Sequence, residues 1–204
     1  MKKILIIWGG WDGHTPEVIA KKLEELLLKE KFSVISTCNF SVLLNQDLTQ
    51  YDVIIPIWSC GINGDIYLNQ LLEAIKSGVG LATFHGGIKW FEDERYYEMI
   101  GSSYLNDSSV ESYEVKFTDS INIITAGIED FNISSEKYFM QVDPRNHILA
   151  TANFSEVSTP VAWTKYYGEG RIFYCTLAHS EDQLFTPSSS ELLMNGIKWC
   201  AVER

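Results

Sequence analysis

The sequence has little positive charge, few cysteines and no long apolar run, and each scarcity excludes a class of protein. Lys and Arg number 16 against 27 Asp and Glu, so the formal net charge is −11, whereas binding to nucleic acid requires clustered basic side chains. No stretch approaches the roughly 20 apolar residues that span a membrane. The four cysteines lie far apart and form no CxxC pair, which indicates reduced thiols rather than a disulfide framework or a zinc–cysteine site. We therefore expect a cytoplasmic protein that binds neither nucleic acid nor a membrane.

The composition is typical of one globular domain. The chain has 204 residues, of which 46% are hydrophobic and 21% charged, and this is enough to bury a full core. The sequence contains no internal repeat, low-complexity tract or linker rich in Pro, Gly or Ser. Its opening apolar run is too short for a signal peptide and lacks a small-residue cleavage site. We expect a single domain over residues 1–204, and the sequence leaves open whether it forms a homo-oligomer.

The first half of the chain alternates predicted strands and helices. Continuous apolar runs, which indicate buried strands, lie at residues 3–8, 32–37, 52–58 and 79–84. Helical periodicity follows Thr15-Pro16, where Thr15 is predicted to cap the helix, and recurs over residues 65–76. Pro56 lacks an N–H group and is predicted to end the pairing of its strand nearby. This βαβ rhythm predicts an α/β fold with a parallel sheet covered on both faces.

The second half has the pattern of antiparallel strands. Residues 112–118 alternate apolar and charged side chains, as in a strand with one exposed face. Residues 161–167 and 171–177 flank Gly168-Glu169-Gly170, a predicted hairpin turn. A closing helix is predicted to begin at Thr186-Pro187. We therefore expect antiparallel additions to a mainly parallel sheet after about residue 105.

The most informative segment reads GVGLATFHGG and ends a predicted strand at His85. Open α/β sheets bind ligands at the carboxyl edge, and Gly86 and Gly87 allow a sharp turn with positive φ whose N–H groups can face a ligand. This is the layout of a nucleophile elbow that presents an imidazole in place of a hydroxyl or thiol. The alternative is a turn histidine satisfied by neighbouring backbone. A strand-end side chain in a cleft makes few core contacts, so His85→Ala is expected to cost no more than about 1 kcal/mol of stability.

Three of the four histidines follow predicted strands. His14 lies in GGWDGHTP, just before a helix N-terminus that can face an anion, and His179 ends RIFYCTLAH. His147 precedes a strand, and we interpret it as a surface residue. Because the carboxyl ends of parallel strands share one edge of a sheet, we expect His14, His85 and His179 to face one pocket.

Two kinds of chemistry suit such a cluster. An imidazole beside Glu136 or Asp12 can act as a general acid or base near neutral pH. Three neutral imidazoles with a carboxylate also suit zinc or another divalent metal, although the spacing of these histidines matches no compact metal motif. The sequence therefore leaves a divalent metal cofactor open.

Four tryptophans lie in or beside the same loops. Flat aromatic faces bind sugar rings, but large aromatics also fill cores. Trp8 and Trp58 end strands and are nearer to the core, whereas Trp11 and Trp90 lie in predicted loops and suit either role. The residues that we expect to bind substrate are Gly10, Trp11, Asp12, Trp58, Gly86, Gly87 and Trp90.

Four segments together resemble the ThuA-like (trehalose-utilisation) family. They read GGWDGHTP, GVGLATFHGG, SSEKYFM and PVAWTKYYGEGRIFYCTLAHSEDQLF, and the resemblance covers nearly the whole chain. It implies a class I glutamine-amidotransferase-like, three-layer flavodoxin-like fold in which His85 takes the place of the amidotransferase cysteine. It also implies that His14, Glu136 and His179 match the family's other polar positions. Ala178 departs from the family pattern, in which Gly commonly precedes the last histidine.

The resemblance implies a role in the catabolism of trehalose and related disaccharides, alongside oxidoreductases that make 3-keto sugars. We therefore hypothesise an enzyme acting on a disaccharide or keto-sugar by acid–base chemistry of the histidines and Glu136, since the proton next to a keto carbonyl is acidified. The alternative is a non-catalytic accessory domain that binds a sugar or another small ligand. A glutaminase is disfavoured because no histidine lies near Cys60 in sequence to activate it. Flavin binding is disfavoured because GGWDGHTP lacks a hydroxyl-rich phosphate loop.

Overall fold

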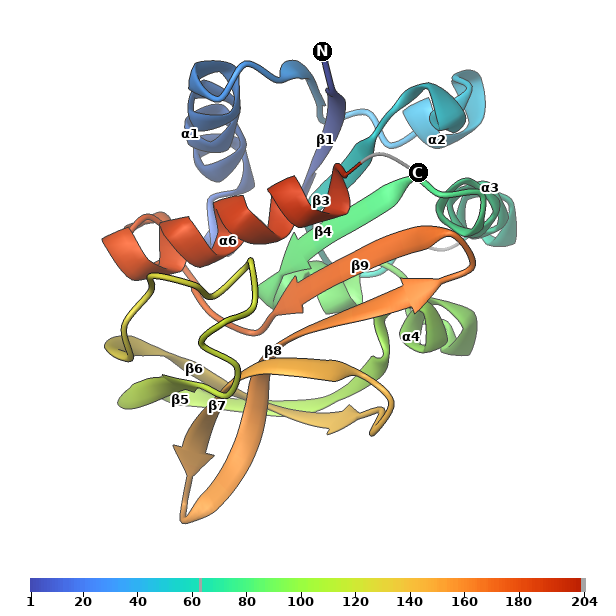
Figure 1. The fold of residues 1–204 in the computed structure, drawn as a ribbon. Coiled ribbons are helices and arrows are strands. Elements are labelled where there is room, and N and C mark those ends of the chain that lie inside the picture. Colours follow the sequence, from blue (N-terminus) through green and yellow to red (C-terminus); the bar gives the residue numbers. More distant parts are fainter. Residues whose placement is uncertain (63, 203–204) are drawn as a thin grey trace.

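The computed structural model describes residues 1–62 and 64–202 and contains one nine-stranded sheet with helices on both faces (Figure 1). The strands are β1 Lys3–Gly10, β2 Ser33–Thr37, β3 Val53–Ser59, β4 Gly80–Phe84, β5 Ser102–Phe117, β6 Phe131–Val142, β7 His147–Phe154, β8 Val157–Tyr167 and β9 Gly170–Cys175. The helices are α1 Pro16–Lys29, α2 Val42–Asn45, α3 Asp65–Lys76, α4 Glu94–Ile100, α5 Glu181–Leu184 and α6 Pro187–Cys200, with short 3-10 turns η1 Asp12–His14, η2 Leu48–Gln50 and η3 His85–Lys89.

The sheet is mixed, with strand order β2-β1-β3-β4-β9-β8-β7-β5-β6. Neighbouring strands from β2 to β9 are parallel, and those from β9 to β6 are antiparallel. The prediction of an α/β fold with antiparallel additions is confirmed. The prediction that the centre of the sheet is mainly parallel is wrong. The pairing changes at β9, the fifth of the nine strands, because the hairpin turn after β8 reverses the chain there. The finer flavodoxin-like assignment stays a prediction.

The alternation of side chains along β1 divides the core into two layers. Ile4 and Ile6 pack with α1 and α6 on one face, whereas Leu5 and Ile7 pack with α3 and α4 on the other. Figure 1 shows these two helix pairs on opposite sides of the parallel half. Among the described residues, no helix is both long and apolar enough to cross a bilayer.

The antiparallel half is built on a long ribbon of β5 and β6. Sequence periodicity predicted only the last part of β5 and missed β6, because much of both strands is polar and exposed. The ribbon bends at register shifts between Tyr104 and Asn106 and between Asp107 and Val110. It brings Glu136, opposite Val110, beside the carboxyl ends of the parallel strands.

Two local predictions are corrected. Pro56 ends pairing on one side only: β3 leaves β4 after Ile54 but stays paired with β1 as far as Ser59. A proline can lie within a strand where its missing N–H is not needed by a neighbour. Thr15 precedes α1 as predicted, but its side chain makes no capping hydrogen bond, and its backbone is left-handed with φ 46°.

Candidate active site

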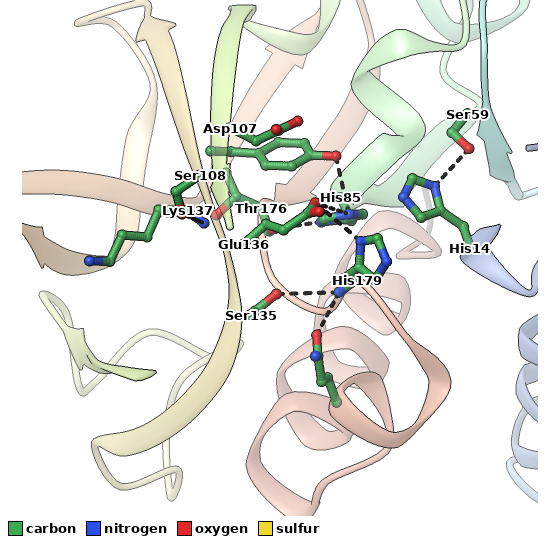
Figure 2. Close-up of polar contacts among 12 residues, drawn as sticks. His14, Ser59, His85, Asp107, Ser108, Ser135, Glu136, Lys137, Thr176 and His179 are labelled. Atoms are coloured by element: carbon green, nitrogen blue, oxygen red, sulfur yellow. Dashed lines mark hydrogen bonds and ion pairs between the residues drawn. The ribbon is translucent and has the colours of Figure 1, made fainter. Parts of the chain in front are cut away.

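Four polar side chains from distant parts of the chain converge at the carboxyl edge of the parallel strands (Figure 2). His14 follows β1, His85 follows β4, His179 follows β9 and Glu136 lies on β6. One nitrogen or oxygen atom from each of the four lies within 4.8 Å of the others. Glu136 Oε2 is 3.4 Å from His85 Nε2 and 3.1 Å from His179 Nδ1. The structure thus brings together all four predicted catalytic residues, and their catalytic role stays a prediction.

His85 is the most deeply buried of the four and is 2% exposed. Its Nδ1 lies 3.2 Å from the carbonyl oxygen of Thr176, and because that oxygen can only accept, Nδ1 donates. Nε2 then accepts from the hydroxyl of Tyr138 at 3.1 Å. Burial lowers the pKa of His85, with smaller opposing contributions from Glu136 and Thr176. The side chain is therefore a neutral imidazole whose acceptor nitrogen faces the cluster.

His14 is held by the end of β3. Its Nδ1 shares a hydrogen bond of 2.7 Å with Ser59 Oγ. Its ring centroid lies 4.9 Å from that of His85 and 4.7 Å from that of His179. Burial, followed by the proximity of these two imidazoles, lowers the pKa of His14 to about 3. At neutral pH His14 is therefore an uncharged imidazole with one N–H donor and one acceptor nitrogen.

Glu136 and His179 are more accessible, with side chains 20% and 21% exposed. The His179 backbone N–H donates to Gln183 Oε1 at 2.8 Å and Ser135 Oγ at 3.3 Å, which holds the residue against α5 and β6. The contact with His85, followed by the charge interactions with the histidines, lowers the pKa of Glu136 to about 2. The carboxylate is thus ionised beside two imidazoles.

Backbone strain concentrates at this site. Of the seven non-glycine residues with positive φ in the described part of the chain, four are site residues or their direct neighbours. They are Thr15 at 46°, Cys60 at 94°, His85 at 44° and Ala178 at 74°. Such conformations cost about 1–2 kcal/mol per residue and persist where surrounding packing enforces them, often at functional sites.

The elbow after β4 differs from its prediction in one respect. His85 itself carries the positive φ, whereas Gly86 and Gly87 were expected to do so. These glycines are required by close packing: a Cβ on Gly86 would lie 2.7 Å from Ser59 Cβ, and one on Gly87 would overlap Thr83 Oγ1. The turn therefore lies directly against β3 and β4.

Two adjoining hollows define the space around the cluster. The inner cavity has a volume of about 20 Å³ and is lined by all three histidines with Gly86 and Gly87. The outer groove has a volume of about 570 Å³ and is lined by Gly10, Trp11, Phe40, Trp58, Cys60, Gly61 and Ile62. Trp58 lines both. The inner cavity has room for one water-sized species, so only the groove can hold a sugar ring.

Of the remaining residues predicted to bind substrate, some line the outer groove, whereas Asp12 and Trp90 do not. Trp11 is 52% exposed, and its ring lies 4.7 Å from that of His14. Asp12 is exposed and is not among the residues that line either hollow in the described part of the chain. The prediction for Trp90 is wrong: the side chain is fully buried and packs on Phe91. Its place after a short 3-10 turn looked like a loop in sequence, but the chain folds back into the core there.

Sequence reasoning missed the residues that hold the histidines. Ser59 ends β3 in the same way that His85 follows β4, so its strand-end position was a usable signal. Tyr138 lies two residues after Glu136 on β6 and so faces the same side of the strand. Thr176 acts through its backbone carbonyl, for which the sequence carries no signal.

Comparisons with known proteins agree with this architecture. A ThuA-like protein of Parabacteroides merdae is 18% identical, with a TM-score of 0.80 over 98% of this chain and 90% of that one. A cytoplasmic protein of Salmonella typhimurium is 14% identical, with a TM-score of 0.71 over the whole of both chains. A cold-adapted β-galactosidase of Rahnella is 12% identical, with a TM-score of 0.63 over all of this chain and 32% of that one. At these identities the likeness shows the fold alone.

The sequence comparison identifies the family directly. No curated protein matches the sequence of this chain. Residues 3–200, however, match the family model described as trehalose utilisation, almost the full length of the chain. The resemblance seen in the sequence motifs is thereby confirmed, and this chain belongs to the ThuA family.

Proposed function

We propose that this protein is an enzyme of disaccharide catabolism, related to trehalose utilisation, that acts on a disaccharide or keto-sugar by proton transfer. Family membership suggests the trehalose-related role. The observation that carries the proposal is the pairing of Glu136 and His179, two partly exposed proton-transfer groups 3.1 Å apart, of which His179 also lines the inner cavity.

A 3-keto glycoside fits this pair chemically. The hydrogen on the carbon next to the carbonyl is acidified, and an ionised carboxylate such as Glu136 can accept it. The electron pair of the broken C–H bond then forms a C=C bond as the glycosidic C–O bond breaks. The departing oxygen takes up a proton from His179 or from water. His85, neutral and fixed by Thr176 and Tyr138, packs beside Glu136 with its Nε2 3.4 Å from Oε2.

The outer groove supplies a place for the sugar. Trp11 and Trp58 both line it, and Trp58 also lines the inner cavity. Aromatic faces bind the apolar faces of sugar rings. The Trp11 ring also lies 4.7 Å from His14, so a sugar stacked on it would reach the histidines.

Glutamine hydrolysis does not fit this site. The residue at the elbow is His85, which carries no thiol. All four cysteines are free thiols, as the sequence predicted, and Cys175 and Cys200 are buried. Cys60 is exposed in the outer groove. A glutaminase would need a thiol hydrogen-bonded to a histidine base, and no such bond is present among the described residues.

The alternative is a sugar-binding module without turnover. It is favoured by one observation: the fold of this chain corresponds to only 32% of the Rahnella β-galactosidase, so such a domain occurs as one part of a larger protein. In such a module the outer groove and its tryptophans would still bind the sugar, and the histidines would only form hydrogen bonds with it.

A turnover experiment separates the two. Trehalose, 3-keto-trehalose and 3-keto-glucosides are incubated with the protein and followed by NMR, beside Glu136→Gln and the distant control His147→Ala. We expect turnover of a keto-sugar that falls about 10²–10⁴-fold in Glu136→Gln and is unchanged in His147→Ala. Binding of the sugars by calorimetry with no turnover by the native protein would establish the module instead.

A further inference from the structure

We propose that His14, His85, His179 and Glu136 bind one divalent first-row transition metal ion at the point where the four side chains converge. The four offer three imidazole nitrogens and one carboxylate oxygen within 4.8 Å of one another. This proposal does not rest on the proposed proton transfer: with the ion bound, Glu136 and His179 are ligands and not a free base and acid, so metal binding is tested separately from turnover.

His85 directs its acceptor nitrogen toward Glu136. With Nδ1–H donated to the Thr176 carbonyl, the lone pair of His85 Nε2 accepts from the Tyr138 hydroxyl at 3.1 Å and lies 3.4 Å from Glu136 Oε2. A divalent cation would take this lone pair in place of the Tyr138 hydroxyl and would bond the carboxylate as well.

His179 presents a second nitrogen to the same carboxylate. Its Nδ1 lies 3.1 Å from Glu136 Oε2 and has no other polar partner among the described residues. Nitrogens of two histidines therefore point at one carboxylate oxygen, which is the arrangement that a shared cation would bridge.

The outer hydrogen bonds suit metal ligands. A ligating histidine usually donates its other ring N–H to a carbonyl, carboxylate or water, which fixes the ring and its tautomer. His85 has the Thr176 carbonyl in this position, and His14 has Ser59 Oγ at 2.7 Å. The ring of His14 is thereby held with Nε2 left for the cluster, as Figure 2 shows.

The spacing of the ligand atoms suits one ion and not two. The inner cavity of about 20 Å³, which the three histidines line, adjoins these atoms and holds a single water-sized species. In a tetrahedral site with metal–ligand bonds of about 2.1 Å, the ligand atoms lie about 3.4 Å apart. Because the ligand atoms here lie within 4.8 Å of one another, the widest pair would close by up to about 1.4 Å when the ion binds. Three nitrogens favour Zn²⁺ and its neighbours over Mg²⁺ or Ca²⁺, which prefer oxygen ligands.

The test measures binding of Zn²⁺ to chelator-stripped protein by calorimetry and by metal analysis after gel filtration. We expect one equivalent per chain, no competition from excess Mg²⁺, and a melting temperature about 5–10 °C higher at a Zn²⁺ concentration 100-fold above Kd. Co²⁺ bound in its place should give a visible absorption band, a readout that needs no substrate.

Variants locate the site. Ser59→Ala, which removes only the support of His14, should weaken Zn²⁺ binding about 10–100-fold. His14→Ala and Glu136→Gln should weaken it further, whereas the fourth histidine provides the matched control His147→Ala, with unchanged affinity. The proposal is overturned if the native protein binds no stoichiometric Zn²⁺, or if His14→Ala and Glu136→Gln bind it as tightly as His147→Ala.

Discussion

Truncation of His85 should destabilise the protein far more than a strand-end residue suggests. The sequence predicted a cost of no more than about 1 kcal/mol for His85→Ala, because a side chain in a cleft makes few contacts. The structure corrects this expectation: His85 is 2% exposed and contacts Thr176, Tyr138 and Glu136. Its side chain is part of the buried structure and not only of the pocket wall.

The magnitude follows from what the truncation leaves behind. Tyr138 is 2% exposed, and its hydroxyl loses its acceptor, which costs about 1–3 kcal/mol for a buried polar group left unpaired. The space of the imidazole adds about 1 kcal/mol of lost packing. Alanine keeps the left-handed φ of 44°, so no strain is released. We expect a loss of about 2–4 kcal/mol in the free energy of unfolding, or about 4–16 °C in melting temperature for a chain of this length.

The assay is urea unfolding of chelator-treated protein followed by circular dichroism. His147→Ala, at an exposed position, is the control and should change stability by less than about 0.5 kcal/mol. His85→Asn should lie between native protein and His85→Ala, since Asn tolerates positive φ and keeps a polar group. A loss below 1 kcal/mol in His85→Ala would refute the view that the buried hydrogen bonds of this imidazole support the fold.

Three further predictions concern single residues around the site. Burial lowers the pKa of His14 from 6.5 to about 3, so the unfolded chain takes up a proton at a higher pH than the folded chain does. The free energy of unfolding of the metal-free protein should therefore fall as pH drops from about 6.5 toward 3. Urea unfolding at pH 7.5 and 5.5 measures this, and an equally steep fall in His14→Gln would contradict it. Ala178→Gly should leave stability unchanged or raise it by up to about 1 kcal/mol, because glycine relieves φ of 74°; a clear loss in the same assay would disprove it. Cys60→Ser should keep sugar turnover within twofold, and abolished turnover would revive a thiol mechanism.

Much of the candidate site could be predicted from local sequence pattern. Apolar runs that stop at a glycine or a histidine define parallel strands, and helical periodicity predicted α3 over its full observed range, Asp65–Lys76. Parallel strands in one sheet end at one edge, so His14, His85 and His179 had to lie near one another once the βαβ pattern was recognised. These features depend on short-range periodicity and chain connectivity, which a sequence displays directly.

Other features depended on neighbours that are distant in sequence. The structural position of Glu136 beside the histidines arises because β6, a largely polar strand, pairs with β5 and not because of its own pattern. Trp90 was expected at the groove and is instead enclosed by α4 and the core. The lowered pKa values of His14 and His85 likewise follow from burial, reinforced at His14 by the neighbouring imidazoles of His85 and His179. The sequence by itself determined which residues reach the edge of the sheet; the tertiary structure decided how deeply each is buried and which groups it faces, because desolvation and hydrogen bonding are set by atoms that only folding brings together.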